Sequence, residues 1–211
     1  MILTSVAAAA ALIRDAAGPA AGRASRRLVV GLVGAPGAGK STAARQLVEA
    51  LGPSAALVGM DGWHLPQSRL VELGRRNRMG ASDTFDVDGF VTALAAIRND
   101  GETVSVPGFD REIEEPVPDA FAITPSFRNI VVEGNYLLHD AGGWEGVAPL
   151  LDLSLFVRLD RDIRMRRLVE RHVRFGKTPD AAAAWANGPD EANARLVEAT
   201  ESRADHILDL G

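Results

Sequence analysis

The sequence contains no cysteine, so disulfide bonds, thiolate metal sites and cysteine catalysis are all excluded. It also lacks any apolar run close to the roughly 18 residues that a membrane-spanning helix needs. No Lys or Arg precedes the alanine-rich start, and Arg14 and Asp15 interrupt it, which argues against a signal peptide. We therefore expect a cytoplasmic protein in which residues 1–17 form an outer helix. A polar link at residues 23–27 should lead from this helix to the first strand.

Lysine is nearly absent from a chain that otherwise uses arginine, and it occurs only at positions 40 and 177. This scarcity makes both lysines worth examining. The formal net charge of −5 argues against general nucleic-acid binding. A length of 211 residues with 46% hydrophobic content is enough for a proper core. We find no internal repeat, and we predict one α/β domain over residues 1–211.

A glycine-rich loop at residues 34–41 follows the apolar run 28–33. After the loop, Leu47, Val48 and Leu51 recur at the spacing of a helix. This order of strand, loop and helix is what the phosphate-binding motif GxxxxGK[ST] of nucleoside-triphosphate enzymes requires. Its glycines let successive backbone N–H groups point into one concavity, where the start of the helix favours a polyphosphate. The predicted phosphate-binding residues are Gly34, Ala35, Pro36, Gly37, Ala38, Gly39, Lys40, Ser41 and Thr42.

Two side chains of this loop have specific predicted roles. Lys40 can reach the β- and γ-phosphates as a point charge, and the Ser41 hydroxyl can take one position on Mg²⁺. The alternative is a glycine-rich turn that binds no ligand.

Two further apolar strands, residues 55–60 and 129–134, end at or beside acidic residues. Ligands of an open parallel sheet bind beyond the carboxyl ends of its strands, so we expect Asp61 and Glu133 beside the phosphate loop. The position of Asp61 suits a carboxylate that accepts the proton of an acceptor hydroxyl. The alternative is that Asp61 is an aspartate of a turn or a helix cap. The position of Glu133 suits a second acidic group that binds Mg²⁺ through a water molecule. Burying a carboxylate without a partner costs free energy, which favours this role.

A basic helix is predicted after a fourth strand at residues 153–159. Arg164, Arg167, Arg171 and Arg174 recur at steps of three or four residues and so share one face of this helix. Four like charges repel one another unless a polyphosphate neutralises them, as in a lid over about residues 164–178. The alternative is a basic surface helix offset by nearby acidic residues.

The other segments carry weaker signals. Residues 68–84 are arginine-rich and weakly patterned, whereas residues 87–97 are helical and could be capped by Asp83, Thr84 or Asp86. A short strand at 103–107 leads into an acidic, proline-bearing stretch, typical of an exposed loop or hairpin that could form a substrate lip. Further expected elements are a short helix at 144–151, helical segments at 180–186 and 190–203, and a closing strand at 206–210.

Several short motifs occur together with the phosphate loop and the arginine lid: Met60–His64, Thr84–Asp86, Pro107–Arg111 and Val132–Tyr136. With them the chain resembles the phosphoribulokinase/uridine kinase/pantothenate kinase family over nearly its whole length. It looks closest to the bacterial branch labelled fructose transport system kinase or nucleoside/nucleotide kinase-like. The resemblance implies a three-layer α/β/α sandwich with a mostly parallel sheet and a helical lid. It also implies Mg·ATP as a partner and phosphorylation of a hydroxyl on a small metabolite.

The resemblance also implies roles for single residues. Asp61 becomes the catalytic base, assisted by Lys40 and by the lid residues Arg167 and Arg171, while Arg174 joins the nucleotide site. The acceptor would bind among His64, Asp86, Phe109, Asp110, Arg111 and Asn135.

Departures from the family pattern bear on the acceptor. Uridine kinases carry Phe-Asp-His-Pro where residues 79–82 here read Met-Gly-Ala-Ser, so the carboxylate that holds the ribose is missing. Phe109 also stands where those enzymes have Tyr. Uridine is therefore disfavoured, and the acceptor is expected to be a sugar, a pantothenate-like or a nucleoside-like compound.

Two other classes of protein stay open as alternatives. One is a regulatory NTPase that acts through a partner, which the absence of an Asn-Lys-x-Asp-like guanine signature disfavours. The other is a nucleotide-binding structural protein with degraded catalysis. A homodimer also stays open.

Overall fold

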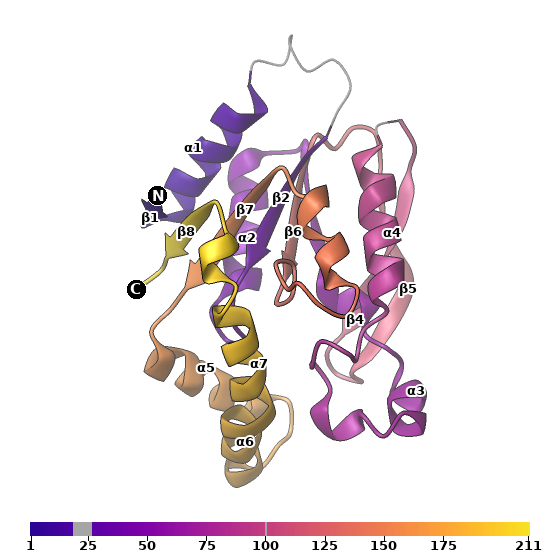
Figure 1. The fold of residues 1–211 in the computed structure, drawn as a ribbon, viewed down its shortest axis with the longest axis vertical. Helices are drawn as coiled ribbons and strands as arrows, with labels where there is room; N and C mark the ends of the chain where they lie inside the picture. Colours follow the sequence, from indigo (N-terminus) through magenta and orange to yellow (C-terminus); the bar gives the residue numbers. More distant parts are fainter. Residues whose placement is uncertain (19–26, 100) are drawn as a thin grey trace.

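A parallel six-stranded sheet forms the centre of the part of the chain that the computed structural model describes, residues 1–18, 27–99 and 101–211. The strand order is β1-β8-β7-β2-β6-β3, and each neighbouring pair is parallel. Figure 1 shows this sheet between helices. Its strands are β1 (Ile2–Leu3), β2 (Leu28–Val33), β3 (Ala55–Gly59), β6 (Asn129–Gly134), β7 (Leu153–Arg158) and β8 (His206–Asp209).

Separate hydrophobic cores cover the two faces of the sheet. Helices α1 (Val6–Ala17) and α2 (Lys40–Leu51) pack on one face, and α4 (Val87–Arg98) packs on the other. Every residue of β2 is buried, and its side chains alternate between the cores, with Val30 in the first and Val29 in the second. The predicted α/β sandwich with a mostly parallel central sheet is thereby confirmed.

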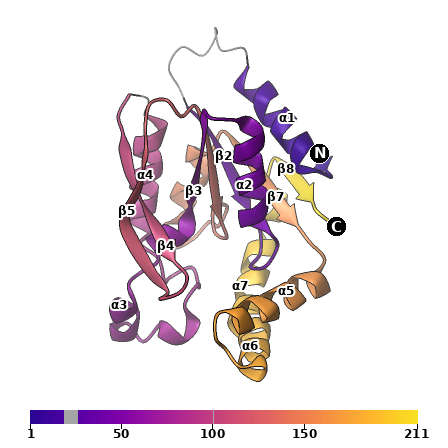
Figure 2. The same cartoon turned by 180° about the vertical axis from the view of Figure 1, so that it is seen from behind.

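The remaining elements surround the carboxyl end of the sheet. They are α3 (Gln67–Glu72), the antiparallel hairpin β4 (Val104–Asp110) and β5 (Glu115–Ile123), α5 (Arg161–Arg174), α6 (Pro179–Trp185) and α7 (Glu191–Glu198). Figure 2 shows α5, which carries most of the predicted lid, and α6 on one side and the hairpin with α3 on the other. Of the two forms expected for the stretch after residue 107, the structure therefore has the hairpin. No helix among the described residues is long and apolar enough to span a bilayer.

Several elements differ from the prediction, among them the helix predicted at 190–203, which α7 covers only to Glu198, and the strand predicted at 103–107, which extends to Asp110. The chain begins with β1, which pairs with β8, and α1 starts only at Val6 after the cap Ser5. A two-residue strand is too short to leave an alternating pattern. Residues 144–151 form two short 3₁₀ turns instead of one helix, and α3 occupies part of the weakly patterned region.

The predicted polar link at residues 23–27 lies outside the described residues except for Arg27, whose side chain is fully buried. Its guanidinium donates to the carbonyl oxygens of Ile97 (2.8 Å), Phe127 (3.2 Å) and Glu102 (3.3 Å). Arg27 therefore acts as a buried donor to backbone carbonyl groups of other segments, a role that the prediction of a polar link did not include.

We expect Arg27→Met to lower the free energy of unfolding by about 2–4 kcal/mol, because three carbonyl groups lose a charged donor. Urea denaturation followed by circular dichroism would measure the change. Arg69→Ala is the matched control, since that side chain is 55% exposed and pairs with Glu72 on its own helix; it should change stability by less than ~0.5 kcal/mol. Equal losses in the two variants would contradict the assigned role of Arg27.

Candidate active site

The phosphate loop connects β2 to α2, and its glycines are required by the backbone. Gly37 and Gly39 have φ angles of +81° and +91°, a region that disfavours residues with a side chain. A Cβ on Gly34 would lie 2.7 Å from the carbonyl oxygen of Val157 on β7. The loop therefore curls tightly against β7, and the first residues of α2 reach the cavity described next.

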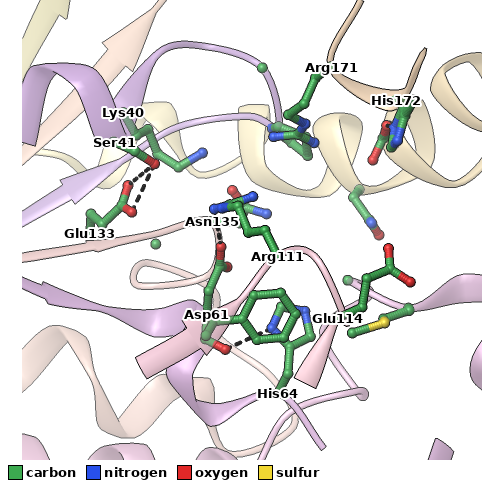
Figure 3. Close-up of a pocket in the computed structure, with 18 of the residues that line it drawn as sticks. Lys40, Ser41, Asp61, His64, Arg111, Glu114, Glu133, Asn135, Arg171 and His172 are labelled. Carbon is green, nitrogen blue, oxygen red and sulfur yellow. Dashed lines mark hydrogen bonds and ion pairs between the residues drawn. The ribbon is translucent and has the colours of Figure 1, made fainter. Parts of the chain in front are cut away.

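A cavity of about 460 Å³ extends from this loop to the hairpin and the lid. Figure 3 shows labelled side chains from all three regions converging on it. Most of the sequence-predicted site residues line this cavity: Pro36, Gly37, Gly39, Lys40, Ser41, Thr42, Asp61, His64, Phe109, Arg111, Glu133, Asn135, Arg167 and Arg171. Gly34, Ala35 and Ala38 are buried parts of the loop behind this surface.

Three predicted site residues outside the phosphate loop do not line the cavity either. Asp86 caps α4, because its carboxylate accepts a hydrogen bond from the Gly89 backbone N–H at 3.0 Å. Asp110 accepts from the backbone N–H of Glu112 at 2.8 Å in the hairpin turn. Arg174 is exposed in the last turn of α5. The geometry thus gives Asp86 and Asp110 local backbone partners and does not support contacts of these three side chains with a ligand.

Lys40 and Ser41 lie at the start of α2, on the side of the phosphate loop. The Lys40 ammonium donates to the carbonyl oxygen of Ala35 at 3.0 Å, and burial lowers its pKa to about 8, although Glu133 and Asp61 oppose this shift. A cation this poorly solvated gains from an incoming phosphate anion.

The Ser41 hydroxyl lies 2.9 Å from each carboxylate oxygen of Glu133, which stands near the end of β6. Burial raises the pKa of Glu133, so its carboxylate gains from a nearby cation. Hydroxyl and carboxylate oxygens are ligands that suit Mg²⁺. These two side chains could therefore hold the metal of a bound nucleotide.

Asp61 lies on the 3₁₀ turn Met60–Trp63 that follows β3. Burial alone would raise its pKa, but His64, Arg111 and Lys40 outweigh that effect and lower the pKa, which keeps the carboxylate ionised. Burial lowers the pKa of His64, whose Nδ1–H donates to the Asp61 carbonyl oxygen at 2.9 Å. The His64 ring packs between Phe85 and Phe109, with centroid separations of 4.0 and 4.7 Å. The turn therefore presents an ionised carboxylate beside an aromatic wall.

The lid arginines separate into different environments. Arg164 is only 1% exposed and pairs with Glu191 of α7 at 2.7 Å, below the phosphate loop. The prediction that a polyphosphate neutralises the whole arginine face is wrong for Arg164, because Glu191 neutralises it. Arg167 and Arg171 do line the cavity, and burial lowers the pKa of Arg171. Two of the four arginines on this face therefore remain available to a ligand.

Several groups that complete the cavity were not among the predicted site residues, although Arg76 belongs to the arginine-rich stretch in which one or two arginines could meet an anionic substrate. Arg76 pairs with Glu114 of the hairpin at 2.6 Å, and His172 lies 2.6 Å from a carboxylate oxygen of Asp190. Arg76 and His172 lie 38 and 18 residues along the chain from their partners, so no local spacing predicts these pairs. Further lining residues that were missed are Arg45, Met79, Gly80, Phe85, Lys177, Trp185 and Asn193. Of these, Lys177 could have been selected from the sequence, because it is one of only two lysines in the chain. Its ammonium lies 4.7 Å from the centre of the Trp185 ring.

We expect Arg171→Ala to weaken the binding of a nonhydrolysable ATP analogue with Mg²⁺ by ~10-fold or more, because a charged donor leaves the cavity. Isothermal titration calorimetry would measure the affinity. The matched control is Arg166→Ala, since Arg166 is exposed on the same helix and does not line the cavity. Arg171 would lose its assigned role if both variants bound the analogue as tightly as the unaltered protein.

Comparison with known proteins agrees with this geometry. The model of the phosphoribulokinase/uridine kinase family matches residues 29–210. The chain is 33% identical to the Escherichia coli protein YggC, over 88% of this chain and 78% of that protein. It is 27% identical to a uridine kinase of Clostridium perfringens, over 88% of each chain. A crystal structure titled "putative fructose transport system kinase", from Silicibacter sp. TM1040, has 38% identity and a TM-score of 0.89, and the match covers 97% of this chain and 99% of that one. As the motifs indicated, the chain belongs to the phosphoribulokinase/uridine kinase family of P-loop kinases.

Proposed function

We propose that this kinase transfers the γ-phosphoryl group of Mg·ATP to a hydroxyl group of a small metabolite. The observation that carries the proposal is the position of Asp61. Its ionised carboxylate lines the same cavity as the phosphate loop, Lys40 and two lid arginines. A nucleotide and an acceptor hydroxyl can therefore meet at one carboxylate.

Binding of the nucleotide uses the phosphate loop. Its backbone N–H groups and Lys40 hold the β- and γ-phosphates, and the start of α2 adds the positive end of the helix dipole. Ser41 would hold Mg²⁺ directly and Glu133 through water. When bound, Mg²⁺ neutralises charge on the phosphates.

The transfer step uses Asp61 and the lid. The acceptor oxygen forms a bond to the γ-phosphorus while the bond from that phosphorus to the bridging oxygen breaks, which leaves ADP. Asp61 orients the acceptor hydroxyl and takes its proton, and an ordinary carboxylate suffices because the transition state is loose. Arg167 and Arg171 balance the charge on the transferred group and help to exclude water.

The acceptor side of the cavity does not match uridine well. Met79 and Gly80 line it where uridine kinases place the ribose-binding carboxylate, and Phe109 stacks against His64 without a hydroxyl. We therefore propose a sugar, a pantothenate-like or another nucleoside-like acceptor. A cytoplasmic location would supply ATP to this reaction, and a homodimer remains an expectation.

We expect Asp61→Asn to reduce turnover by ~10²-fold or more, because the amide cannot accept the hydroxyl proton, while Mg·ATP affinity stays within about threefold. Coupled ADP release with the acceptor, alongside nucleotide titration, measures both quantities. Unchanged turnover in this variant would remove Asp61 from the role of base.

Lys40→Ala should instead weaken the productive nucleotide complex by ~10-fold or more, because the phosphates lose their buried cation. The measurement is the KM for ATP together with calorimetric binding of an ATP analogue. Full activity at low ATP concentration would contradict phosphate binding by this loop.

A further inference from the structure

The proposed catalytic carboxylate already has a cationic partner. The Arg111 guanidinium, near the tip of the β4–β5 hairpin, lies 2.6 Å from Oδ2 of Asp61. Figure 3 shows this ion pair between the phosphate loop and the acceptor side of the cavity. A carboxylate in such a pair is a weaker base and offers fewer free lone pairs to a hydroxyl. We therefore expect transfer to be faster when Arg111 releases Asp61 or shares it.

The hairpin gives Arg111 a fixed backbone and room for its side chain. Next to the tip, Glu114 pairs with Arg76, and its carbonyl oxygen accepts from the Gln67 side chain at 2.8 Å. The Arg111 side chain is itself 43% exposed and also borders a second cavity of about 270 Å³. The side chain can therefore move away from Asp61 while the hairpin tip stays in place.

A released Arg111 needs another anion. The guanidinium does not lose its proton. Its positive charge disfavours the charged forms of the nearby Lys40 and Arg171, because like charges repel. Among the described residues that line the main cavity, seven are Lys or Arg and four are Asp or Glu. Mg·ATP brings roughly two net negative charges and so leaves a positive excess. One further anionic group would balance the filled site.

We propose that the acceptor is an anionic hydroxy compound, in which a carboxylate or phosphate group binds Arg111 while the hydroxyl binds Asp61. This inference rests on the proposed kinase function and deepens it. Arg111 becomes a specificity-determining residue, because an anionic acceptor draws it off the catalytic carboxylate and a neutral acceptor does not. The competing destination for Arg111 is the γ-phosphate, which would make the enzyme indifferent to acceptor charge.

The test compares acceptors that differ mainly in one anionic group. Suitable pairs are glycerate and glycerol, pantothenate and pantothenyl alcohol, and glucose 6-phosphate and glucose. The first two pairs report on carboxylates and the third on phosphate. ADP release with Mg·ATP gives kcat and KM for each compound. We expect kcat/KM to be ~10-fold or more higher for the anionic member of at least one pair.

Arg111→Ala should remove this preference by raising KM for the anionic acceptor ~10-fold or more. With the neutral partner kcat should stay the same or rise, because Asp61 is then no longer paired with a guanidinium. Arg111→Lys should restore part of the preference, because it keeps the charge but loses the forked donors. Arg69→Ala, an exposed ion-paired arginine outside the cavity, should retain the full preference. Thermal melting of each variant checks that it is folded.

Two results would overturn the inference and leave the kinase proposal standing. One is equal kcat/KM for both members of every pair that is phosphorylated, or a preference for the neutral member. The other is an Arg111→Ala variant that loses activity equally with both members. A wild-type protein that phosphorylates no hydroxyl compound would instead overturn the proposed function itself.

Discussion

The tight packing between the backbone of the phosphate loop and its neighbours is the constraint on which the site depends. Gly34 leaves no room for a side chain against β7, and a Cβ on Gly37 would lie 3.0 Å from the carbonyl oxygen of Arg164 on α5. The buried pair between Arg164 and Glu191 then connects α5 to α7. Because loop, strand and lid contact one another so closely, the backbone segments that carry Lys40 and the cavity-lining lid arginines are held around one space. More basic than acidic side chains line that space, which favours an anionic ligand such as a polyphosphate.

Those parts of the fold whose cause is local could be predicted from the sequence. The buried strands are continuous apolar runs, and the glycine loop has its own spacing and flanks, so the central sheet and the cavity's position followed from short segments. Asp61 and Glu133 were placed correctly beside the loop, because the carboxyl ends of parallel strands meet at one edge of the sheet. Their chemical roles remain proposals. That they lie near Ser41, however, could be predicted from the order and direction of the strands alone.

Features that arise from pairing over long distances along the chain could not be predicted. Nothing in the local sequence shows that Arg27 and Arg164 are buried, and both are buried because their partners lie far along the chain. The same holds for Arg76, whose partner Glu114 lies on the hairpin. Periodicity assigns a residue to a face of a helix but does not say which neighbour covers that face. This is why the arginine face was predicted as a unit and is divided in the structure.

The central claim is that this site transfers phosphate to an acceptor and does not simply hydrolyse the nucleotide. The most direct measurement is ³¹P NMR of the products formed from Mg·ATP with a panel of sugars, hydroxy acids and nucleosides. We expect equal amounts of ADP and of a new phosphate ester on one acceptor, with little inorganic phosphate. Formation of ADP and inorganic phosphate alone, at a rate that no acceptor changes, would contradict the account and favour a regulatory NTPase.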